Sequence, residues 1–253
     1  MAKLFDLELV FKQIPKILKY LPETLELAVI SLIIGLVLGL IIALVKIKKV
    51  PVLSQIFSVY ISVLRGTPII VQLYITYFGI PILLRYINYY HGTNYNINGI
   101  PPMLFAIVAL GLNQSAHDAE TIRAALLSVD KGQIEAAHSL GMTGFQTLKR
   151  IILPEAITVA LPSLGNSIIA LIKGTSLAFA CSVIEMTAQA KILAGRNYRY
   201  FEAYISLAIV YWLITIIVER IIKFLEKRTS IPDKVDEKAF EKWKGALEQN
   251  DRD

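Results

Sequence analysis

The feature that most constrains this chain is its first apolar run, residues 27–45, in which Ser31 is the only clearly polar side chain. An uninterrupted run of about 18 or more apolar residues is long enough to cross a bilayer as one helix. Apolar residues make up 55% of the chain and the mean hydropathy is +0.56, above the roughly 45–50% apolar usage of soluble proteins. The sequence therefore predicts an all-α, polytopic membrane protein rather than two soluble domains.

About five transmembrane helices are expected from the apolar runs. The predicted spans are residues 27–45, 71–85, 103–112 with a polar continuation, 153–172 and 203–218. Residues 173–200 are expected to form a broken helix and a short re-entrant segment. Such irregular backbone is tolerated at membrane depth only where it is buried in protein or lines a cavity.

The chain divides into three parts. Residues 1–21 are predicted to form an amphipathic segment in the membrane interface, residues 22–225 the transmembrane domain, and residues 226–253 a charged cytoplasmic tail. Lysine and arginine are enriched in cytoplasmic loops, so the basic positions 46–49, Arg65, 131, 149–150 and 220–228 are assigned to the inside. The loop at residues 86–100 has no lysine or arginine and is assigned to the outside. This predicts an external N-terminus and a cytoplasmic C-terminus.

Several function classes are disfavoured. The net charge of +6 fits basic cytoplasmic loops and does not by itself indicate nucleic-acid binding. The single cysteine, Cys181, leaves no internal disulfide or cysteine cluster. The three histidines, at positions 91, 117 and 138, fall in an outer loop, a membrane segment and a cytoplasmic loop. The chain has no Walker-type phosphate loop, so we expect neither enzymatic activity nor a bound cofactor.

A polar, helix-prone stretch at residues 132–144 interrupts the apolar chain. It must lie in an aqueous loop, and the neighbouring Lys149 and Arg150 place that loop in the cytoplasm. Ala136 and Ala137 would allow close approach of a partner, and Gly141 would allow a sharp turn. We interpret this stretch as a handle by which a soluble motor moves the membrane part.

The same stretch resembles the signature of one transporter family. Glu135-Ala136-Ala137, three residues, Gly141, nine residues and Ile-Ile-Leu-Pro at 151–154 match every fixed position of the EAA motif of ABC importer permeases. Further matches to the polar amino-acid group of that family are Arg65-Gly66-Thr67-Pro68 with Gln72, Ala119-Glu120 with Arg123, Asp130-Lys131-Gly132-Gln133, and Lys173 with Thr175-Ser176. The resemblance extends over residues 20–225.

The resemblance implies an importer subunit of the type I permease fold in a prokaryotic cell membrane. Two permease chains, identical or homologous, would form the pore. Two ATPase subunits carrying ATP and Mg²⁺ would dock from the cytoplasm, and an external binding protein would deliver an amino acid. Residues 131–145 would be the coupling helix in a groove of the ATPase, with Glu135, Ala136, Ala137 and Gly141 as contact residues.

The candidate solute residues lie in the third and fourth predicted spans. Glu120 and Arg123 could meet the charged groups of a zwitterion or pair with each other. His117 and Asp118 depart from the residues usual in this family, and we interpret them as specificity determinants, with subunit contacts as the alternative. Arg65-Gly66-Thr67-Pro68 is interpreted as a gating element rather than part of the solute site.

Two further groups of side chains complete the predicted site. Gln72 and Asn166 could line the cavity or make interhelical hydrogen bonds. Lys173, Thr175 and Ser176 lie near a helix break, where exposed backbone groups can bind charged solutes, although Lys173 could instead extend to the outer interface. The family often has an acidic residue where this chain has Gly174, so a cationic solute is disfavoured and L-cystine is favoured. The alternative function is an ATP-independent channel or an ion-coupled carrier for a small organic solute.

Overall fold

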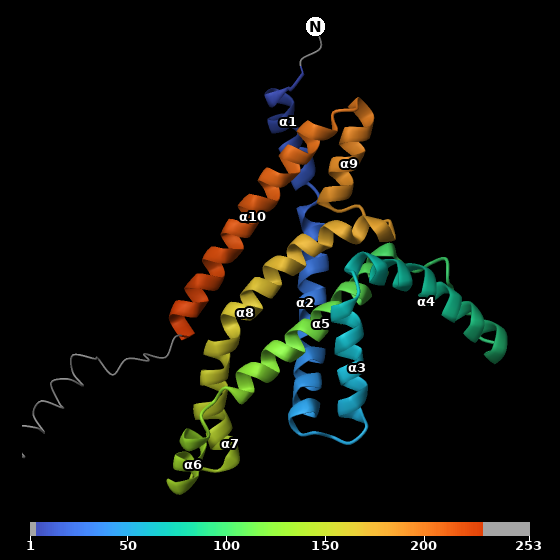
Figure 1. Cartoon of the computed structure of the whole chain (residues 1–253). Coiled ribbons are helices and arrows are strands. Elements are labelled where there is room, and N and C mark those ends of the chain that lie inside the picture. The colour runs from blue at the N-terminus through green and yellow to red at the C-terminus, as the bar shows by residue number, and fades with distance from the viewer. Residues whose placement is uncertain (1–3, 230–253) are drawn as a thin grey trace, which may run out of the picture.

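The computed structural model describes residues 4–229, and every element in that range is helical (Figure 1). In chain order the elements are α1 Leu7–Leu18, α2 Leu21–Ile47, α3 Leu53–Gly66, α4 Ile69–His91, α5 Pro102–Leu127, α6 Lys131–Ser139, α7 Gly144–Thr147, the π-helix η1 Leu148–Ile152, α8 Leu153–Gly174, the 3₁₀-helix η2 Thr175–Cys181, α9 Met186–Asn197 and α10 Tyr200–Thr229. The predicted all-α membrane fold is confirmed.

Four helical stretches are long and apolar enough to cross a membrane within the described residues. They are α2, α4, the continuous stretch Gly144–Cys181 and α10. The other predicted span is α5, whose 26 residues extend about 39 Å at 1.5 Å per residue. Its C-terminal half contains the polar continuation seen in the sequence. α5 is therefore not apolar enough to count among the four candidate spans. The four candidate spans together with α5 correspond to the predicted number of about five transmembrane helices.

The helices are longer than the apolar runs that predicted them. α4 continues to His91, so the first six residues of the predicted outer loop at 86–100 are helical. Its end is set by Gly92, whose φ of +63° provides a left-handed C-cap. Similarly, α10 extends through Thr229 and includes the first residues of the predicted tail. Residues 230–253 of that tail lie outside the described part of the chain.

The elements separate into two ends joined by long helices (Figure 1). α1 and α9 lie at one end, and α6, α7 and the turn between α2 and α3 lie at the other. α5 and α8 cross between these ends, while α4 projects away from the bundle. The predicted re-entrant region is resolved into η2 and α9, which return the chain to the start of α10.

The N-terminal helix is part of the folded body. Val10 and Ile17 are fully buried, and Ser206 of α10 donates a 2.9 Å hydrogen bond to the Val10 carbonyl. The backbone N–H of Asp6 donates to the carboxylate of Glu202 at 3.2 Å. The segment predicted to lie in the membrane interface therefore packs against α10.

α2 and α5 approach closely because α2 presents two glycines to α5. A Cβ added to Gly35 would lie 2.5 Å from Cγ of Gln114, and one added to Gly39 would lie 3.0 Å from the backbone nitrogen of Ala119. A Gly-x-x-x-Gly spacing places both glycines on one helix face, which is a common way to bring membrane helices together. This contact fixes the position of the polar half of α5.

Candidate functional site

The α6–α7 segment (residues 131–147) is shaped by local capping signals. Asp130 accepts a hydrogen bond from the backbone N–H of Gly132 and caps the start of α6. At the other end, Met142 N–H donates to Ala137 O at 3.1 Å and Gly141 N–H to His138 O at 2.9 Å. This pair of bonds is the Schellman pattern, which requires a left-handed residue after the helix. Gly141 supplies it with φ +77°, so the expected sharp turn is present.

A second cap follows at once. Thr143 accepts from Gln146 N–H at 3.3 Å, while the Gln146 side chain accepts from Thr143 N–H at 2.8 Å. This capping box starts α7. The predicted single helix at 131–145 is thus two short helices joined at Gly141 and continued into η1 and α8.

One face of the α6–α7 segment packs on the chain and the other is exposed. Ala137 is only 2% exposed, so this predicted contact residue faces its own protein. Glu135, Ala136 and Gly141 are exposed. Two large apolar side chains beside them, Leu140 and Phe145, are 83% and 73% exposed. The exposed face therefore combines a carboxylate with apolar groups at one tip of the molecule (Figure 1).

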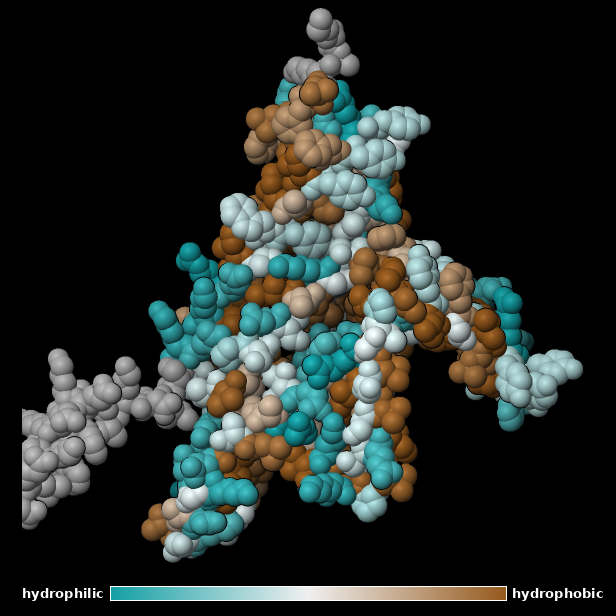
Figure 2. Space-filling view, viewed as in Figure 1, coloured by the Kyte–Doolittle hydropathy of each residue, from teal (hydrophilic) through white to brown (hydrophobic). Residues whose placement is uncertain are grey.

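A separate polar cavity of about 420 Å³ lies between α3, α5 and α8. Hydrophilic side chains gather in the region between α3 and α8, flanked by apolar surfaces (Figure 2). The cavity is lined by Arg65, Ile69, Leu110, Asn113, Gln114, His117, Glu120, Thr121, Ser163, Asn166, Ser167, Ala170, Leu171 and Gly174. We refer to it as the α3–α5–α8 cavity.

An ion-pair triad stands at one wall of this cavity. Glu120 accepts from Lys46 Nζ of α2 at 2.6 Å and from Arg123 Nη2 at 2.8 Å. The three side chains are 19–34% exposed. Of the two sequence alternatives for Glu120 and Arg123, the structure shows mutual pairing, with Lys46 as an additional partner. Both carboxylate oxygens of Glu120 are thereby engaged.

Arg65 lies in a helix, whereas the sequence predicted that it lies in a loop. It was assigned to an inside loop, but it lies in the last turn of α3, about 18 Å along the helix from Leu53. There it lines the cavity together with His117. Arg65 belongs to none of the salt bridges found within the described residues. Arg65 therefore lies at the end of a helix and at the cavity, rather than in a loop.

Gln72 holds the cavity wall together. Its side-chain nitrogen donates to Leu64 O at 2.8 Å, and its oxygen accepts from Asn113 at 3.1 Å. Asn113 also donates to Leu64 O at 3.1 Å. These bonds join α3, α4 and α5, which is the interhelical alternative stated for Gln72.

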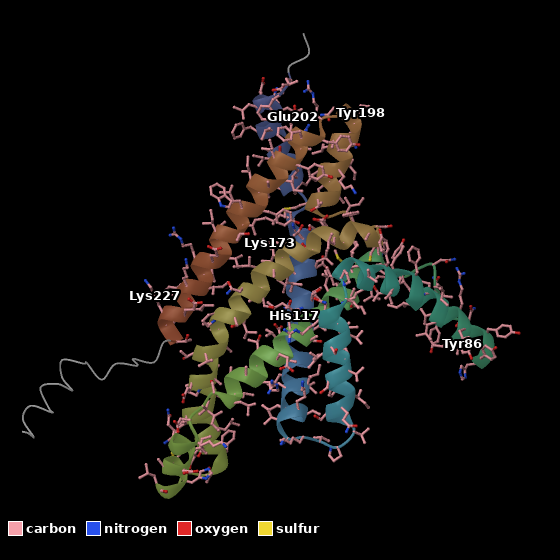
Figure 3. The ribbon with its side chains drawn as sticks, viewed as in Figure 1. Tyr86, His117, Lys173, Tyr198, Glu202 and Lys227 are labelled. Carbon is pink, nitrogen blue, oxygen red and sulfur yellow. The ribbon has the colours of Figure 1, made fainter. Side chains whose placement is uncertain are left out.

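The other predicted solute residues fall into two groups. His117, Glu120 and Asn166 line the cavity, and Figure 3 shows His117 near the crossing of α5 and α3, with Lys173 farther along α8 towards η2. The residues outside the lining are Gln72, Asp118, Arg123, Lys173, Thr175 and Ser176. Asp118 is fully buried, and Thr175 is buried with its hydroxyl donating to Ile172 O at 2.6 Å. Near the helix break, Gly174 is the residue that reaches the cavity.

Six polar lining residues were not among the predicted solute residues: Arg65, Asn113, Gln114, Thr121, Ser163 and Ser167. A periodic signal could have found part of this set. Ser163, Asn166 and Ser167 follow the i, i+3, i+4 spacing that shares one helix face. Asn113, His117 and Glu120 show the corresponding stripe on α5. Two polar stripes on otherwise apolar helices indicate a shared polar cavity.

Comparison with known proteins connects both regions to one family. A family model described as "binding-protein-dependent transport system inner membrane component" matches residues 35–231. The probable amino-acid permease protein YxeN of Bacillus subtilis (strain 168) is 43% identical over 227 residues, which cover 90% of this chain and 97% of the relative. The L-cystine transport system permease protein TcyL of the same strain is 40% identical over 228 residues, covering 90% and 93%.

A solved structure extends this similarity to the fold. The crystal structure of an amino acid ABC transporter with histidines matches with a TM-score of 0.75 at 37% identity, covering 88% of this chain and 99% of the other. The α6–α7 segment and the cavity residues all fall within the residues that match the family model.

Proposed function

Because this chain belongs to the family of binding-protein-dependent transport system inner membrane components, we propose that its α3–α5–α8 cavity carries a polar or sulfur amino acid, L-cystine foremost. The chain is the permease subunit of an amino-acid ABC transporter, as the motifs implied, and ATP hydrolysis lies on a separate subunit. The solute, its contacts and the docking of partners form the proposal.

The observation that carries the proposal is the charge arrangement of the cavity. Glu120 is neutralised by Lys46 and Arg123, whereas Arg65 lines the cavity without a salt bridge inside the described chain. A guanidinium presents several N–H donors in a plane that matches a carboxylate. Arg65 is therefore the group best suited to the solute carboxylate, and His117 and Asn166 supply further polar contacts.

The glycine at position 174 favours a solute whose side chain carries no positive charge. Gly174 lines the cavity, and the nearest atom to a Cβ added there is Leu110 Cδ2 at 3.9 Å. An acidic residue, common in the family at this position, would fit and would attract a cationic solute. Its absence, together with the similarity to an L-cystine permease, favours L-cystine.

The exposed face of the α6–α7 segment is proposed to dock on the ATPase. Glu135 offers a carboxylate to a basic residue, and Leu140 and Phe145 offer apolar area that water otherwise surrounds. This docking places α6 in the cytoplasm and, because α1 lies at the opposite end (Figure 1), the N-terminus outside. Two permease chains, two ATPases and an external binding protein complete the proposed importer.

The test is uptake by proteoliposomes that contain the permease, its ATPase and its binding protein. Labelled L-cystine is expected to accumulate only with ATP inside, and L-arginine is expected to compete poorly. Gly174→Asp should improve binding of L-arginine to the purified complex, with Gly174→Asn as the uncharged control. Uptake without ATP would indicate the channel or carrier alternative, and failure to import any amino acid would refute the proposal.

A further inference from the structure

Asp118 is a fully buried carboxyl group in the middle of α5. Its Oδ1 accepts from Gln114 Nε2 at 2.8 Å and from Ser167 Oγ at 3.3 Å. Its Oδ2 is buried without a hydrogen-bond partner among the described residues. Burying a polar group in this way costs free energy. This cost indicates that the Asp118 carboxyl group has a functional role.

The hydrogen bonds of Asp118 fix the direction of one cavity side chain. Gln114 Nε2 donates both to Asp118 Oδ1 and to Ser167 Oγ, at 2.8 and 2.7 Å. An amide nitrogen has two N–H donors, so both are used. Within residues 4–229, the Gln114 oxygen Oε1 makes no hydrogen bond, and Gln114 lines the cavity.

The chemistry of a carboxyl group makes this orientation one-sided. Oδ1 accepts from both Gln114 Nε2 and Ser167 Oγ, so any proton on Asp118 must lie on Oδ2. The NH₂ end of Gln114 must therefore face Asp118, and the reversed amide would place two acceptors together. Packing confines both side chains, since a Cβ added to Gly35 of α2 would lie 2.5 Å from Gln114 Cγ and 3.1 Å from Asp118 Oδ2.

We propose that Asp118 is a positioning residue that holds Gln114 with its Oε1 available to accept a hydrogen bond from the solute ammonium group. With Arg65 at the carboxylate, the cavity would then recognise the two charged groups shared by all free amino acids. This inference rests on the proposed function, because it assumes that the solute enters the α3–α5–α8 cavity.

The test measures binding of labelled L-cystine and L-glutamine to the assembled permease–ATPase complex in nanodiscs, without the binding protein. Asp118→Asn keeps the shape but lets the amide of residue 114 adopt either orientation. Affinity for both solutes should fall about 10-fold or more, the loss expected for an oriented hydrogen bond to a charged group. Ser115→Ala is the matched control, because Ser115 is buried in α5 but bonds to Tyr60 and Leu112 O.

A double-mutant cycle separates positioning from a merely structural role. Gln114→Met removes the amide, so adding Asp118→Asn to it should cost no further affinity; additive losses would overturn the inference. If Asp118→Asn does not assemble, the same double-mutant cycle can be made with Ser167→Ala and Gln114→Met. Ser167→Ala alone is expected to weaken binding several-fold. Unchanged affinity in Asp118→Asn also overturns it. Failure of the wild-type complex to bind either amino acid would instead refute the proposed function.

Discussion

The α6–α7 segment and the α3–α5–α8 cavity position their functional side chains in different ways. Within the segment, the capping bonds join residues two to five positions apart, as in Asp130 to Gly132 and Ala137 to Met142. Around the cavity, the corresponding bonds join distant parts of the chain, with Lys46 and Glu120 separated by 74 positions and Gln114 and Ser167 by 53.

The difference determines how each region responds to change. In the α6–α7 segment, one substitution that changes the local backbone conformation can alter the exposed face, while the helices of the bundle remain folded. A cavity built from four helices depends on their packing, so a single polar substitution changes affinity or stability by degrees.

Reversal of charge on the exposed face of α6 should have the largest effect. Glu135→Lys should abolish uptake and solute-stimulated ATPase activity, because it places a cation where the proposed ATPase surface is basic. Membrane insertion should be unchanged, since Glu135 is exposed and makes no side-chain ion pair within the described residues. Gln133→Lys, also exposed on α6, is the control and should retain uptake. Normal uptake by Glu135→Lys would show that this face does not dock.

The turn after α6 should be almost as sensitive. Gly141 has φ +77°, a conformation that costs a non-glycine residue about 1–2 kcal/mol. Gly141→Asp should therefore misplace Leu140 and reduce ATPase coupling strongly, measured as solute-stimulated hydrolysis in proteoliposomes. Gly144→Asp is the matched control, because Gly144 starts α7 without a positive φ and has open space around it. Equal losses in the two variants would contradict a role for the turn geometry.

In the cavity, removal of the Arg65 cation, which has no salt bridge within residues 4–229, should weaken solute binding without abolishing assembly. Arg65→Gln is expected to lower affinity for L-cystine about 10- to 100-fold, since a charge-assisted hydrogen bond contributes about 1.5–3 kcal/mol. Arg85→Gln provides the control, as Arg85 is an exposed arginine of α4 outside this cavity. Binding to nanodisc complexes is the measurement, and equal affinity of both variants would exclude Arg65 from the solute site.

The same contrast explains what could be predicted from the sequence. The spans could be predicted because a run of consecutive apolar residues is sufficient to indicate a membrane helix. The turn at Gly141 could be predicted because it depends on neighbouring residues only. Helix ends were misplaced where capping, as at Gly92, rather than hydropathy decides them. The location of α6 as a separate short helix likewise follows from caps that the hydropathy pattern does not contain.

The cavity was predicted only in part because its residues meet through helix packing. Nothing near Arg65 in the sequence shows that α3 carries it away from the basic turn and towards His117. Lys173 and Gly174 are neighbours, yet the rotation of α8 places Gly174 at the cavity and leaves Lys173 exposed. Glu120 was recognised as important, but its partner Lys46 is 74 positions away and no local pattern connects them.

The smallest expected effect compares a long-range ion pair with a local one. Glu120→Gln removes the charge that holds Lys46 of α2 and Arg123 of α5. These groups are partly screened by solvent, so the expected loss is about 1–2 kcal/mol, seen as a lower midpoint in thermal unfolding of the detergent-solubilised protein. Glu8→Gln removes the i, i+4 pair with Lys12, whose side chains are 66–67% exposed, and should leave the midpoint unchanged. A larger shift for Glu8→Gln would mean that α1, rather than the contact of α2 with α5, limits the stability of the bundle.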